Sequence, residues 1–389
     1  MRAAEIASGN GMAVTVFDAK PSVGRKFLVA GRGGLNLTKD EPRDVFATRY
    51  AGPDQPEGFW QSLIAEFDSG ALRAWAAGLG VETFVASSKR VYPKEMKAAP
   101  LLRRWLQRLR AAGVEFAMRH RWTGITRSGD RLAFTFETDD GPKTVQADAG
   151  ILALGGGSWP ETGSDGGWLE PVHTLGIQTS PLVSANCGWE TAWSAEVLEA
   201  AEGEPLKNVS ALAGGHEAIG ELLVTRYGLE GGIIYQLGPA LRAMELPIIT
   251  IDLKPSLSVE QLVAKLGPIR RNFLVEACQR WKLSKAAAAL LAFSQRLNPA
   301  SSCEEIAAAC KACSIPLDRP RPIAEAISSA GGICWAELDH DLMLKKMPGL
   351  FVAGEMIDWE APTGGYLMQG CFATGTRAGR AAAAWASRI

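Results

Sequence analysis

The segment at residues 351–379, FVAGEMIDWEAPTGGYLMQGCFATGTRAG, constrains the fold of this 389-residue chain most strongly. A short apolar strand is predicted over residues 350–353, and it breaks at Gly354 shortly before two carboxylates. A Gly-Gly pair then precedes an alanine-rich helix that begins near Tyr366. This order of strand, glycine break and helix predicts an α/β unit in which the helix N-terminus closes on a cofactor.

Each part of this layout suits a flavin. Gly354 has no Cβ where the backbone and a cofactor must approach closely, and Glu355 can accept hydrogen bonds from ribityl hydroxyls. The helix N-terminus offers free N–H groups and a partial positive charge. Reduced flavin carries negative charge on its pyrimidine edge, which such a helix end stabilises. An ordinary strand-loop-helix with turn glycines is the alternative that this segment alone leaves open.

The N-terminal region carries a second nucleotide-binding signal. Residues 13–17 predict a buried strand that ends in Asp18. In dinucleotide-binding βαβ units an acid at this place binds the adenosine ribose, roughly 20 residues after a glycine-rich phosphate turn. Residues 2–8 instead predict the end of a first helix and residues 9–11 its turn, so the first strand and its G-x-G-x-x-G are missing from the sequence. A start codon placed too late, a trimmed chain and a lost element all explain this.

Several further motifs, taken with Asp18 and the C-terminal segment, resemble one known family. Together they are similar to the YhiN/BaiN-like family of bacterial flavoproteins, in the two-dinucleotide-binding-domain superfamily that includes glutathione reductase. The resemblance covers most of the chain. The motifs are PSVGRKFLVAGRGGLNLT at residues 21–38, RVYP at 90–93, LALGGGSWPETGSDGG at 152–167, TRYGLEGG at 225–232 and AGGI at 330–333.

The resemblance implies an FAD-dependent oxidoreductase acting on a small organic substrate. Members of the family with proposed roles include reductases of unsaturated bile-acid-type ketones and amine oxidases. No catalytic acid or base stands out in this sequence. Carried over by motif, the expected cofactor-binding residues are Asp18, Lys26, Asn36, Thr38, Gly155, Gly156, Gly354, Glu355, Gly364, Gly365, Tyr366 and Gln369. The candidates for substrate contact are Tyr92, Lys94, Arg226 and Tyr227, for which ordinary packing or surface roles are the alternative.

The expected fold class is α/β, with a discontinuous Rossmann-like FAD-binding domain and an inserted β-rich domain that itself carries a helical insert. Residues 1–182 and 323–389 are assigned to the FAD-binding domain, 183–254 and 314–322 to the β-rich substrate domain, and 255–313 to the helical insert. Short Gly-, Val- and Ile-rich segments predict β-structure up to Leu253. Apolar residues at helical spacing predict the insert, namely Leu262, Leu266, Ile269, Phe273 and Leu274.

Composition excludes some partners. With 41 basic and 42 acidic residues, the net charge of −1 favours no polyanionic partner. No apolar run reaches the length of a membrane span, and no signal peptide is recognisable. Seven cysteines, an odd number, favour reduced thiols in the cytoplasm. Cys310 and Cys313 form a CxxC without a second ligand pair nearby, so a role as buried small side chains is favoured over a metal site. The sequence leaves the oligomeric state open.

A cluster of arginines raises one nucleic-acid hypothesis. Residues 103–131 hold eight arginines against two acids, which would suit RNA. Apolar residues recur at helical spacing over residues 101–109, so a solvent-exposed helix face with Arg103, Arg104, Arg108 and Arg110 is the favoured interpretation. A flavin-dependent RNA-modifying enzyme is therefore a minor alternative.

Two further questions stay open at this level. No second complete nucleotide-binding fingerprint accompanies residues 155–157, so NAD(P)H is expected at most as a transient electron donor, and an oxidase that uses oxygen is the alternative. The missing phosphate turn also makes a shortened, non-catalytic or weakly flavin-binding protein the main rival to an active enzyme.

Overall fold

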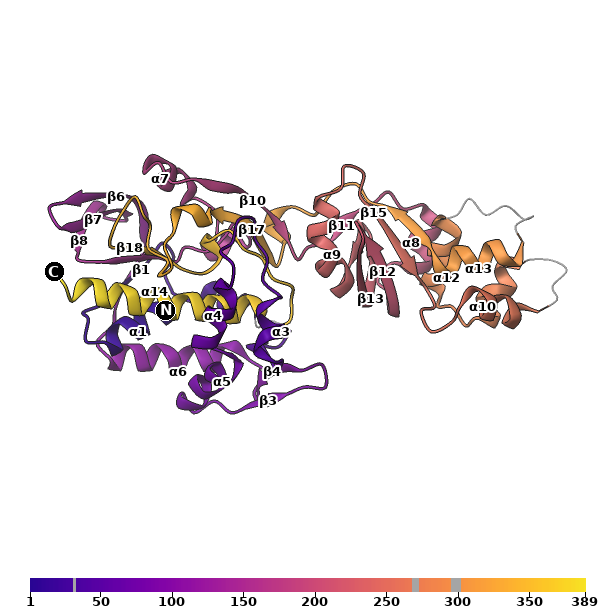
Figure 1. Ribbon diagram of the computed structural model, residues 1–389, viewed down its shortest axis with the longest axis horizontal. Helices are drawn as coiled ribbons and strands as arrows, with labels where there is room; N and C mark the ends of the chain where they lie inside the picture. Colours follow the sequence, from indigo (N-terminus) through magenta and orange to yellow (C-terminus); the bar gives the residue numbers. More distant parts are fainter. Residues whose placement is uncertain (31–32, 268–272, 295–301) are drawn as a thin grey trace. The chain divides into compact units, whose positions relative to one another are not determined.

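A computed structural model describes residues 1–30, 33–267, 273–294 and 302–389. The chain forms two compact units: Met1–Val183 with Ser328–Ile389 (unit 1), and Ser184–Ile327 (unit 2) (Figure 1). Compactness distinguishes two units, so the separate helical insert and the exact domain boundaries stay predictions. No helix in the described ranges is long and apolar enough to cross a membrane.

Unit 1 contains two pairs of parallel strands. Strand β1 (Thr15–Asp18) pairs in parallel with β5 (Glu115–Met118), in the register Thr15 to Glu115. Strand β9 (Gly150–Leu152) pairs in parallel with β18 (Leu350–Val352), in the register Gly150 to Leu350. Each pair forms its own two-stranded sheet in the described part of the chain. The strands expected near residues 13–17, 149–154 and 350–353 are thereby confirmed.

The other strands of unit 1 are antiparallel or short. One sheet has the order β6-β7-β8, another β2-β4-β3, and β10 pairs with β17. Their bounds are β2 (Thr38–Lys39), β3 (Thr83–Val85), β4 (Arg90–Pro93), β6 (His120–Ser128), β7 (Arg131–Thr138), β8 (Gly141–Ala147), β10 (Thr179–Ala185) and β17 (Ser328–Ile333).

Helices cover these sheets. Their bounds are α1 (Arg2–Gly9), α2 (Arg25–Ala30), α3 (Arg43–Ala47), α4 (Phe59–Glu66), α5 (Ser69–Gly78), α6 (Ala98–Ala111), α7 (Leu169–Thr174) and α14 (Tyr366–Ala386), with 3-10 turns η1 (Pro160–Thr162), η3 (Trp335–Glu337) and η4 (Gly354–Met356).

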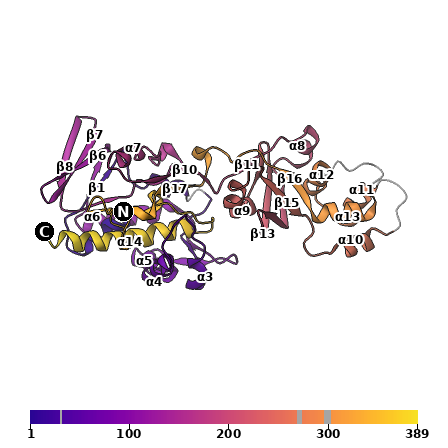
Figure 2. The same ribbon diagram turned by 45° about the horizontal axis from the view of Figure 1, so that its top comes forward.

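The long C-terminal helix α14 packs closely against α1, and both views show it running through unit 1 (Figures 1 and 2). Gly379 allows this approach, because a Cβ there would lie 2.6 Å from the carbonyl oxygen of Ala3. Helix α6 buries Leu101, Trp105 and Leu109 against the same core. Its apolar face was expected from the sequence, and the helix is confirmed.

One arginine of α6 differs from expectation. Arg108 does not project freely into solvent: its guanidinium lies 2.5 Å from Glu5 of α1, and its side chain is 33% exposed. Arg103 and Arg110 are exposed, as expected. The positive charge of Arg108 therefore pairs α6 with α1 within unit 1.

Unit 2 is built on a six-stranded antiparallel sheet with the order β11-β14-β13-β12-β15-β16. Serine capping boxes begin helices α10 and α13, at Ser258 and Ser302. Its elements are β11 (Trp189–Glu190), β12 (Pro205–Ala213), β13 (His216–Thr225), β14 (Gly228–Glu230), β15 (Ile248–Asp252), β16 (Cys313–Pro316), α8 (Ala195–Ala201), α9 (Gly232–Arg242), α10 (Val259–Leu266), α11 (Phe273–Arg280), α12 (Lys285–Ser294), α13 (Cys303–Lys311) and η2 (Ile323–Glu325).

Two helices in unit 2 differ from the sequence expectation. The stretch up to Leu253 was expected to be β-structure, but α8 and α9 lie within it. Helix α9 forms because Ile233, Leu237 and Leu241 recur on one buried face, although they lie among glycines that suggest turns. The helices expected beyond residue 257 are confirmed over the described residues, while the predicted core residue Ile269 lies outside them.

Candidate functional site

Lys26 brings together three segments that are far apart in the sequence. From helix α2, its Nζ donates to Glu355 Oε2 at 2.7 Å, to Ser158 Oγ at 2.9 Å and to Ser164 Oγ at 3.1 Å. The side chains of Lys26 and Glu355 are only 26% and 12% exposed. We call these four residues the Lys26 cluster. It joins two of the residues predicted from motifs, Lys26 and Glu355, to two serines that the prediction missed.

The glycines after β9 are required by close contacts. Gly155 has φ of +79°, and a Cβ on Gly156 would lie 1.8 Å from Ser329 Oγ. The N–H of Gly157 donates to the same hydroxyl at 3.0 Å. These contacts hold the turn beside the Lys26 cluster, to which it is joined through Ser158, and cofactor binding by Gly155 and Gly156 stays a prediction.

The start of α14 lies against strand β2. A Cβ on Gly365, which has φ of +99°, would lie 2.6 Å from the backbone of Thr38, so only glycine fits there. Gln369, one turn into α14, is fully buried and donates from Nε2 to the carbonyl of Phe67 at 2.6 Å. The sequence prediction named Thr38, Gly365 and Gln369 separately, and Gly365 is where α14 meets Thr38.

Three buried oxygens in this region have no hydrogen-bond partner within the described residues. They are Asn36 Oδ1, Thr38 Oγ1 and Gln369 Oε1, which we call the orphan oxygens. Leaving a buried polar group unpaired costs about 1–3 kcal/mol, so proteins rarely do so without reason. All three residues were predicted to bind the cofactor.

Tyr366 anchors the N-terminus of α14. Its hydroxyl donates to Glu41 Oε2 at 2.6 Å, and its carbonyl accepts from Tyr50 Oη at 2.8 Å. Burial raises the pKa of the Tyr366 phenol, and the hydrogen bond to Glu41 raises it further. The phenol therefore stays protonated and holds the helix start in place. Gly364 precedes it with φ of +124°.

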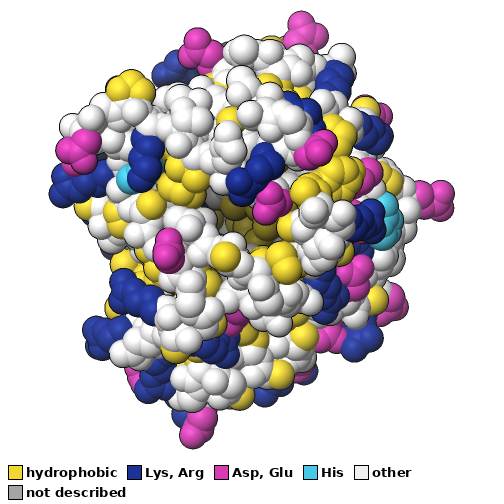
Figure 3. Space-filling view, turned by 90° about the vertical axis from the view of Figure 1, so that its left-hand side faces the viewer, with side chains coloured by type: hydrophobic (Ala, Val, Ile, Leu, Met, Phe, Trp, Pro, Cys, Tyr) yellow, Lys and Arg dark blue, Asp and Glu magenta, His cyan; other side chains and the backbone are white. Residues whose placement is uncertain are grey.

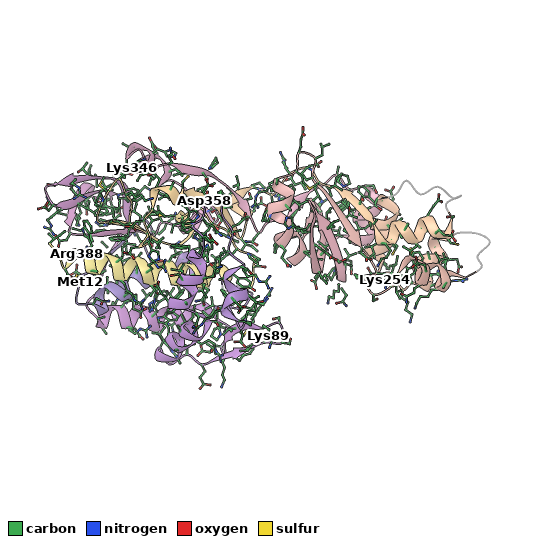
Figure 4. All side chains as sticks on the ribbon, in the orientation of Figure 1. Met12, Lys89, Lys254, Lys346, Asp358 and Arg388 are labelled. Atoms are coloured by element: carbon green, nitrogen blue, oxygen red, sulfur yellow. The ribbon has the colours of Figure 1, made fainter. Side chains whose placement is uncertain are left out.

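At the glycine after β18, Gly354 has φ of +75° and its N–H donates to Thr374 Oγ1 at 3.0 Å. Asp358, four residues further on, is 3% exposed and accepts a hydrogen bond from Ser180 Oγ. Burial raises the pKa of the Asp358 carboxyl, partly offset by its hydrogen bonds from Ser180 and from the backbone of Gly331. Figure 4 labels Asp358 among the packed side chains of unit 1. Asp358 is one of the two carboxylates that follow Gly354 in the sequence, and the sequence predicts no role for it.

Asp18 is the last residue of strand β1. Its Oδ1 accepts the N–H of Lys20 at 2.8 Å. Burial raises the pKa of the Asp18 carboxyl, a shift reduced by that hydrogen bond and by the charges of Arg25 and Lys20. Asp18 also lines a cavity of about 690 Å³ between β1 and β9, which we call the β1–β9 cavity.

The four candidate substrate contacts are divided between the units. In unit 1, Tyr92 stacks on Phe84 with ring centroids 5.9 Å apart, and Lys94 is exposed and paired with Glu82. In unit 2, Arg226 is exposed, whereas the Tyr227 hydroxyl donates to Glu230 Oε2 at 2.6 Å. A shared substrate contact for these residues stays a prediction.

The cysteine pair of unit 2 has the environment of packed thiols. Cys310 and Cys313 are both fully buried, and burial raises the pKa of Cys313 to about 11 and that of Cys310 to about 12. Such thiols are protonated at neutral pH. Across the described ranges, no group of three His, Cys, Asp or Glu side chains is arranged to hold a metal.

Comparison with known families covers almost the whole chain. Residues 1–381 match the family described as HI0933-like protein Rossmann domain. The chain belongs to this family. The HI0933-like match, together with the relative below, confirms the family expected from the motifs and the mixed α/β, Rossmann-type fold.

This HI0933-like chain is similar in sequence to one relative and in fold to two solved structures, among others. It is 28% identical, over 95% of its length and 92% of the relative's, to a 3-dehydro-bile acid delta(4,6)-reductase of Clostridium scindens. An open-conformation flavocytochrome c3 fumarate reductase has a TM-score of 0.53 at 14% identity, covering 99% of this chain and 76% of that one. The 3-ketosteroid-delta4-(5alpha)-dehydrogenase of Rhodococcus jostii RHA1, in complex with 4-androstene-3,17-dione, has a TM-score of 0.53 at 14% identity, covering 98% and 94%. At this identity the solved structures establish fold alone.

The residues present fit one half of an FAD molecule better than the other. The orphan oxygens, the Lys26 cation and the N-terminus of α14 offer acceptors, a positive charge and free N–H groups of the kind a flavin and its pyrophosphate require. At the adenosine end Asp18 is in place, whereas the sequence has no G-x-G-x-x-G turn to bind the phosphates. The residues present therefore offer more of the groups that FAD requires on the flavin side than on the nucleotide side.

Proposed function

We propose that this chain is an FAD-dependent oxidoreductase that reduces a carbon–carbon double bond conjugated to a ketone on a small, mainly apolar molecule. The observation that carries the proposal is the alignment with a bile-acid reductase over 95% of this chain and 92% of the relative. The orphan oxygens and the Lys26 cluster support it, because unpaired buried acceptors and a partly buried ammonium are groups that a bound cofactor would pair.

Each part of the site has a distinct task in this proposal. The flavin supplies the hydride when it is bound. Asn36, Thr38 and Gln369 accept hydrogen bonds from the bound cofactor, which removes the cost of their unpaired oxygens. The N-terminus of α14, fixed by Tyr366 and Gly365, stabilises negative charge beside it. Lys26 neutralises Glu355 and would supply positive charge to the anionic part of the cofactor.

Electron donor and substrate contacts belong to the proposal as well. NAD(P)H serves as a transient donor, without a dedicated second fingerprint. Tyr92, Lys94, Arg226 and Tyr227 remain the candidate contacts to substrate. For Tyr227, the hydroxyl is already bonded to Glu230 and the guanidinium of Arg321 lies 4.6 Å from the ring centroid.

Anaerobic spectroscopy tests the proposal. We expect the purified chain, supplied with FAD, to show flavin absorption that NADPH bleaches and that a 4-ene-3-ketosteroid restores, with the saturated ketone as product. Bleaching by an amine and not by NADPH would instead support the oxidase alternative. If no flavin is retained at saturating FAD, the oxidoreductase proposal is wrong for this chain.

A further inference from the structure

One face of the β2-β4-β3 sheet collects aromatic and basic side chains. The register places Phe84 of β3 directly opposite Tyr92 of β4, and Lys39 of β2 directly opposite Arg90 of β4. Because alternate residues of a strand point to the same face, these four side chains share one face, which we call the β4 face. Val91, between Arg90 and Tyr92, is fully buried on the other face.

The aromatic half of the β4 face is partly open to solvent. The rings of Phe84 and Tyr92 stack with their centroids 5.9 Å apart, and Phe84 is 38% exposed. Met96 is also 38% exposed, and its methyl group lies 2.7 Å from where a Cβ on Gly34 would be. The Tyr92 ring lies 3.7 Å from the same point, so Met96 and Tyr92 flank Gly34. Covering such apolar surface stabilises a complex by about 25 cal/mol per Å².

The basic half of the β4 face has an unpaired cation. Lys39 and Arg49 both pair with Glu41, at 3.1 and 3.3 Å. Arg90 is exposed and has neither a hydrogen bond nor an ion pair within the part of the chain that the structure describes. Since Glu41 is already shared by two cations, the guanidinium of Arg90 is the group that an added negative charge would pair.

The β4 face adjoins the residues proposed to bind the cofactor. Arg90 Nε lies 4.0 Å from where a Cβ on Gly364 would be, and the Lys39 ammonium lies 5.4 Å from the centroid of the Tyr366 ring. Strand β2 also contains Thr38, which carries one of the orphan oxygens. A molecule bound on the β4 face would therefore lie beside the start of α14.

The β4 face differs from the hollow on another side of unit 1. Figure 3 views the left-hand side of Figure 1 and shows a hollow with hydrophobic side chains in its floor and charged side chains of both signs at its rim. Strands β3 and β4 lie at the lower edge of unit 1 in Figure 1, away from that side. Their aromatic surface comes with an unpaired guanidinium, which favours an apolar ligand that carries a negative charge.

We propose that the β4 face binds the non-reacting part of the substrate, and that this part has an apolar body and a carboxylate. Arg90 binds the carboxylate, because a guanidinium presents parallel N–H donors to its two oxygens. Phe84 and Tyr92 hold the apolar body. Alternate residues of a strand lie about 7 Å apart, so a ligand that reaches from Arg90 to the ring of Tyr92 contains two or more rings. Arg90 then determines which ketones bind. This inference rests on the proposed function, in which the substrate is a mainly apolar ketone.

A matched pair of ligands tests the role of Arg90. The acid is a 4-ene-3-ketosteroid with a carboxylate on its side chain, and its methyl ester is the neutral partner. Equilibrium dialysis against the FAD-supplemented chain, without an electron donor, measures both dissociation constants. We expect Arg90→Gln to weaken binding of the acid by about tenfold and to leave that of the ester unchanged, with Arg90→Lys between the two. Arg103→Gln, at an exposed arginine of α6, controls for net charge and should change neither constant.

Three outcomes of the dialysis overturn the proposal. They are equal affinities of the acid and the ester for the parent chain, no binding of either ligand, and equal weakening of both by Arg90→Gln. A substitution in the aromatic half adds a separate check. Phe84→Ser removes an exposed ring without changing charge, so it should weaken binding of the acid and the ester alike, by about fivefold. An unchanged affinity for both ligands would reject the β4 face as the site of the apolar body.

The binding site and the proposed function can fail separately. Binding of the acid that depends on Arg90, without reduction of either ligand by NADPH, would reject the proposed function and keep the β4 face as a site for such molecules. Reduction of the acid with the same KM in the parent and Arg90→Gln chains would keep the proposed function and reject the β4 face.

Discussion

The Lys26 cluster and the β1–β9 cavity lie in the same unit, yet they are opposite kinds of site. The cluster is polar and closed: one ammonium bonds a carboxylate and two hydroxyls from two segments that are distant in the sequence from Lys26. The cavity is mainly apolar and open, with two unpaired strand edges and about 690 Å³ of space. The Lys26 cluster is thus held in place by side-chain bonds, whereas Asp18 lies beside a sheet that is not continuous in the described residues.

This contrast predicts where cofactor affinity is gained and lost. Side-chain contacts at the Lys26 cluster and the orphan oxygens are already in place, so changing them should affect FAD binding directly. Asp18 stands at the edge of the cavity, where its position depends on β1. Substitutions at the Lys26 cluster, at the orphan oxygens and at Asp18 should therefore differ in whether they change the stability of the chain, its affinity for FAD, or both.

The largest effect is expected at Lys26. Lys26→Met leaves the Glu355 carboxylate, which is 12% exposed, without its cation. Removing one partner of a largely buried charged pair costs about 2–3 kcal/mol, and FAD affinity should fall with it. The measurement is urea unfolding of the chain without FAD, followed by FAD titration. Lys94→Met is the matched control, since its pair with Glu82 is exposed, and equal unfolding midpoints for the two variants would contradict the role of the cluster.

Asp18→Ala should have the next largest effect, and mainly on affinity. Without the carboxylate, ribose hydroxyls are left poorly paired, which weakens FAD binding by about 1–3 kcal/mol. The chain without FAD should not lose comparable stability, because burial already raises the pKa of Asp18 and so disfavours its charged form. FAD titration by fluorescence measures the change. An unaltered dissociation constant would remove Asp18 from the site.

Thr38→Val distinguishes an orphan oxygen from an ordinary packing residue. The substitution keeps the shape and removes Oγ1, which has no partner among the described residues. The free chain should therefore be as stable or more stable, by up to about 1 kcal/mol, whereas FAD should bind about fivefold more weakly. Opposite signs in unfolding and titration experiments identify a cofactor contact. A loss of stability with unchanged affinity would make Thr38 purely structural.

The sequence predicted local elements better than the contacts between them. The helix at α14, the strands β1, β9 and β18 and the glycine turns follow from local signals such as apolar runs and Gly pairs. The pairing of Lys26 with Glu355 was not predicted, although both residues were named, because 329 positions separate them and no local pattern encodes such a contact. Ser158 and Ser164 were missed since an isolated serine carries no distinctive pattern. Helix α9 was missed because glycines and Pro239 surround its apolar face.

The smallest effect is expected at Asp358, a buried carboxyl that belongs to neither region. Burial raises the pKa of Asp358 in the folded state. As pH rises, the unfolded chain loses this proton near its carboxyl pKa of about 3.9, whereas the folded chain still holds it. The resulting stability is fully present below that pH and is lost as pH rises through the folded-state pKa. Asp358→Asn retains an acceptor for Ser180 but has no carboxyl to titrate, so its free energy of unfolding lacks this pH dependence. Between acidic and neutral pH, the free energy of unfolding of the variant should therefore rise by about 1 kcal/mol or less relative to that of the parent chain. Urea unfolding across this range measures the difference between the two chains. A difference that stays constant with pH would show that Asp358 titrates normally.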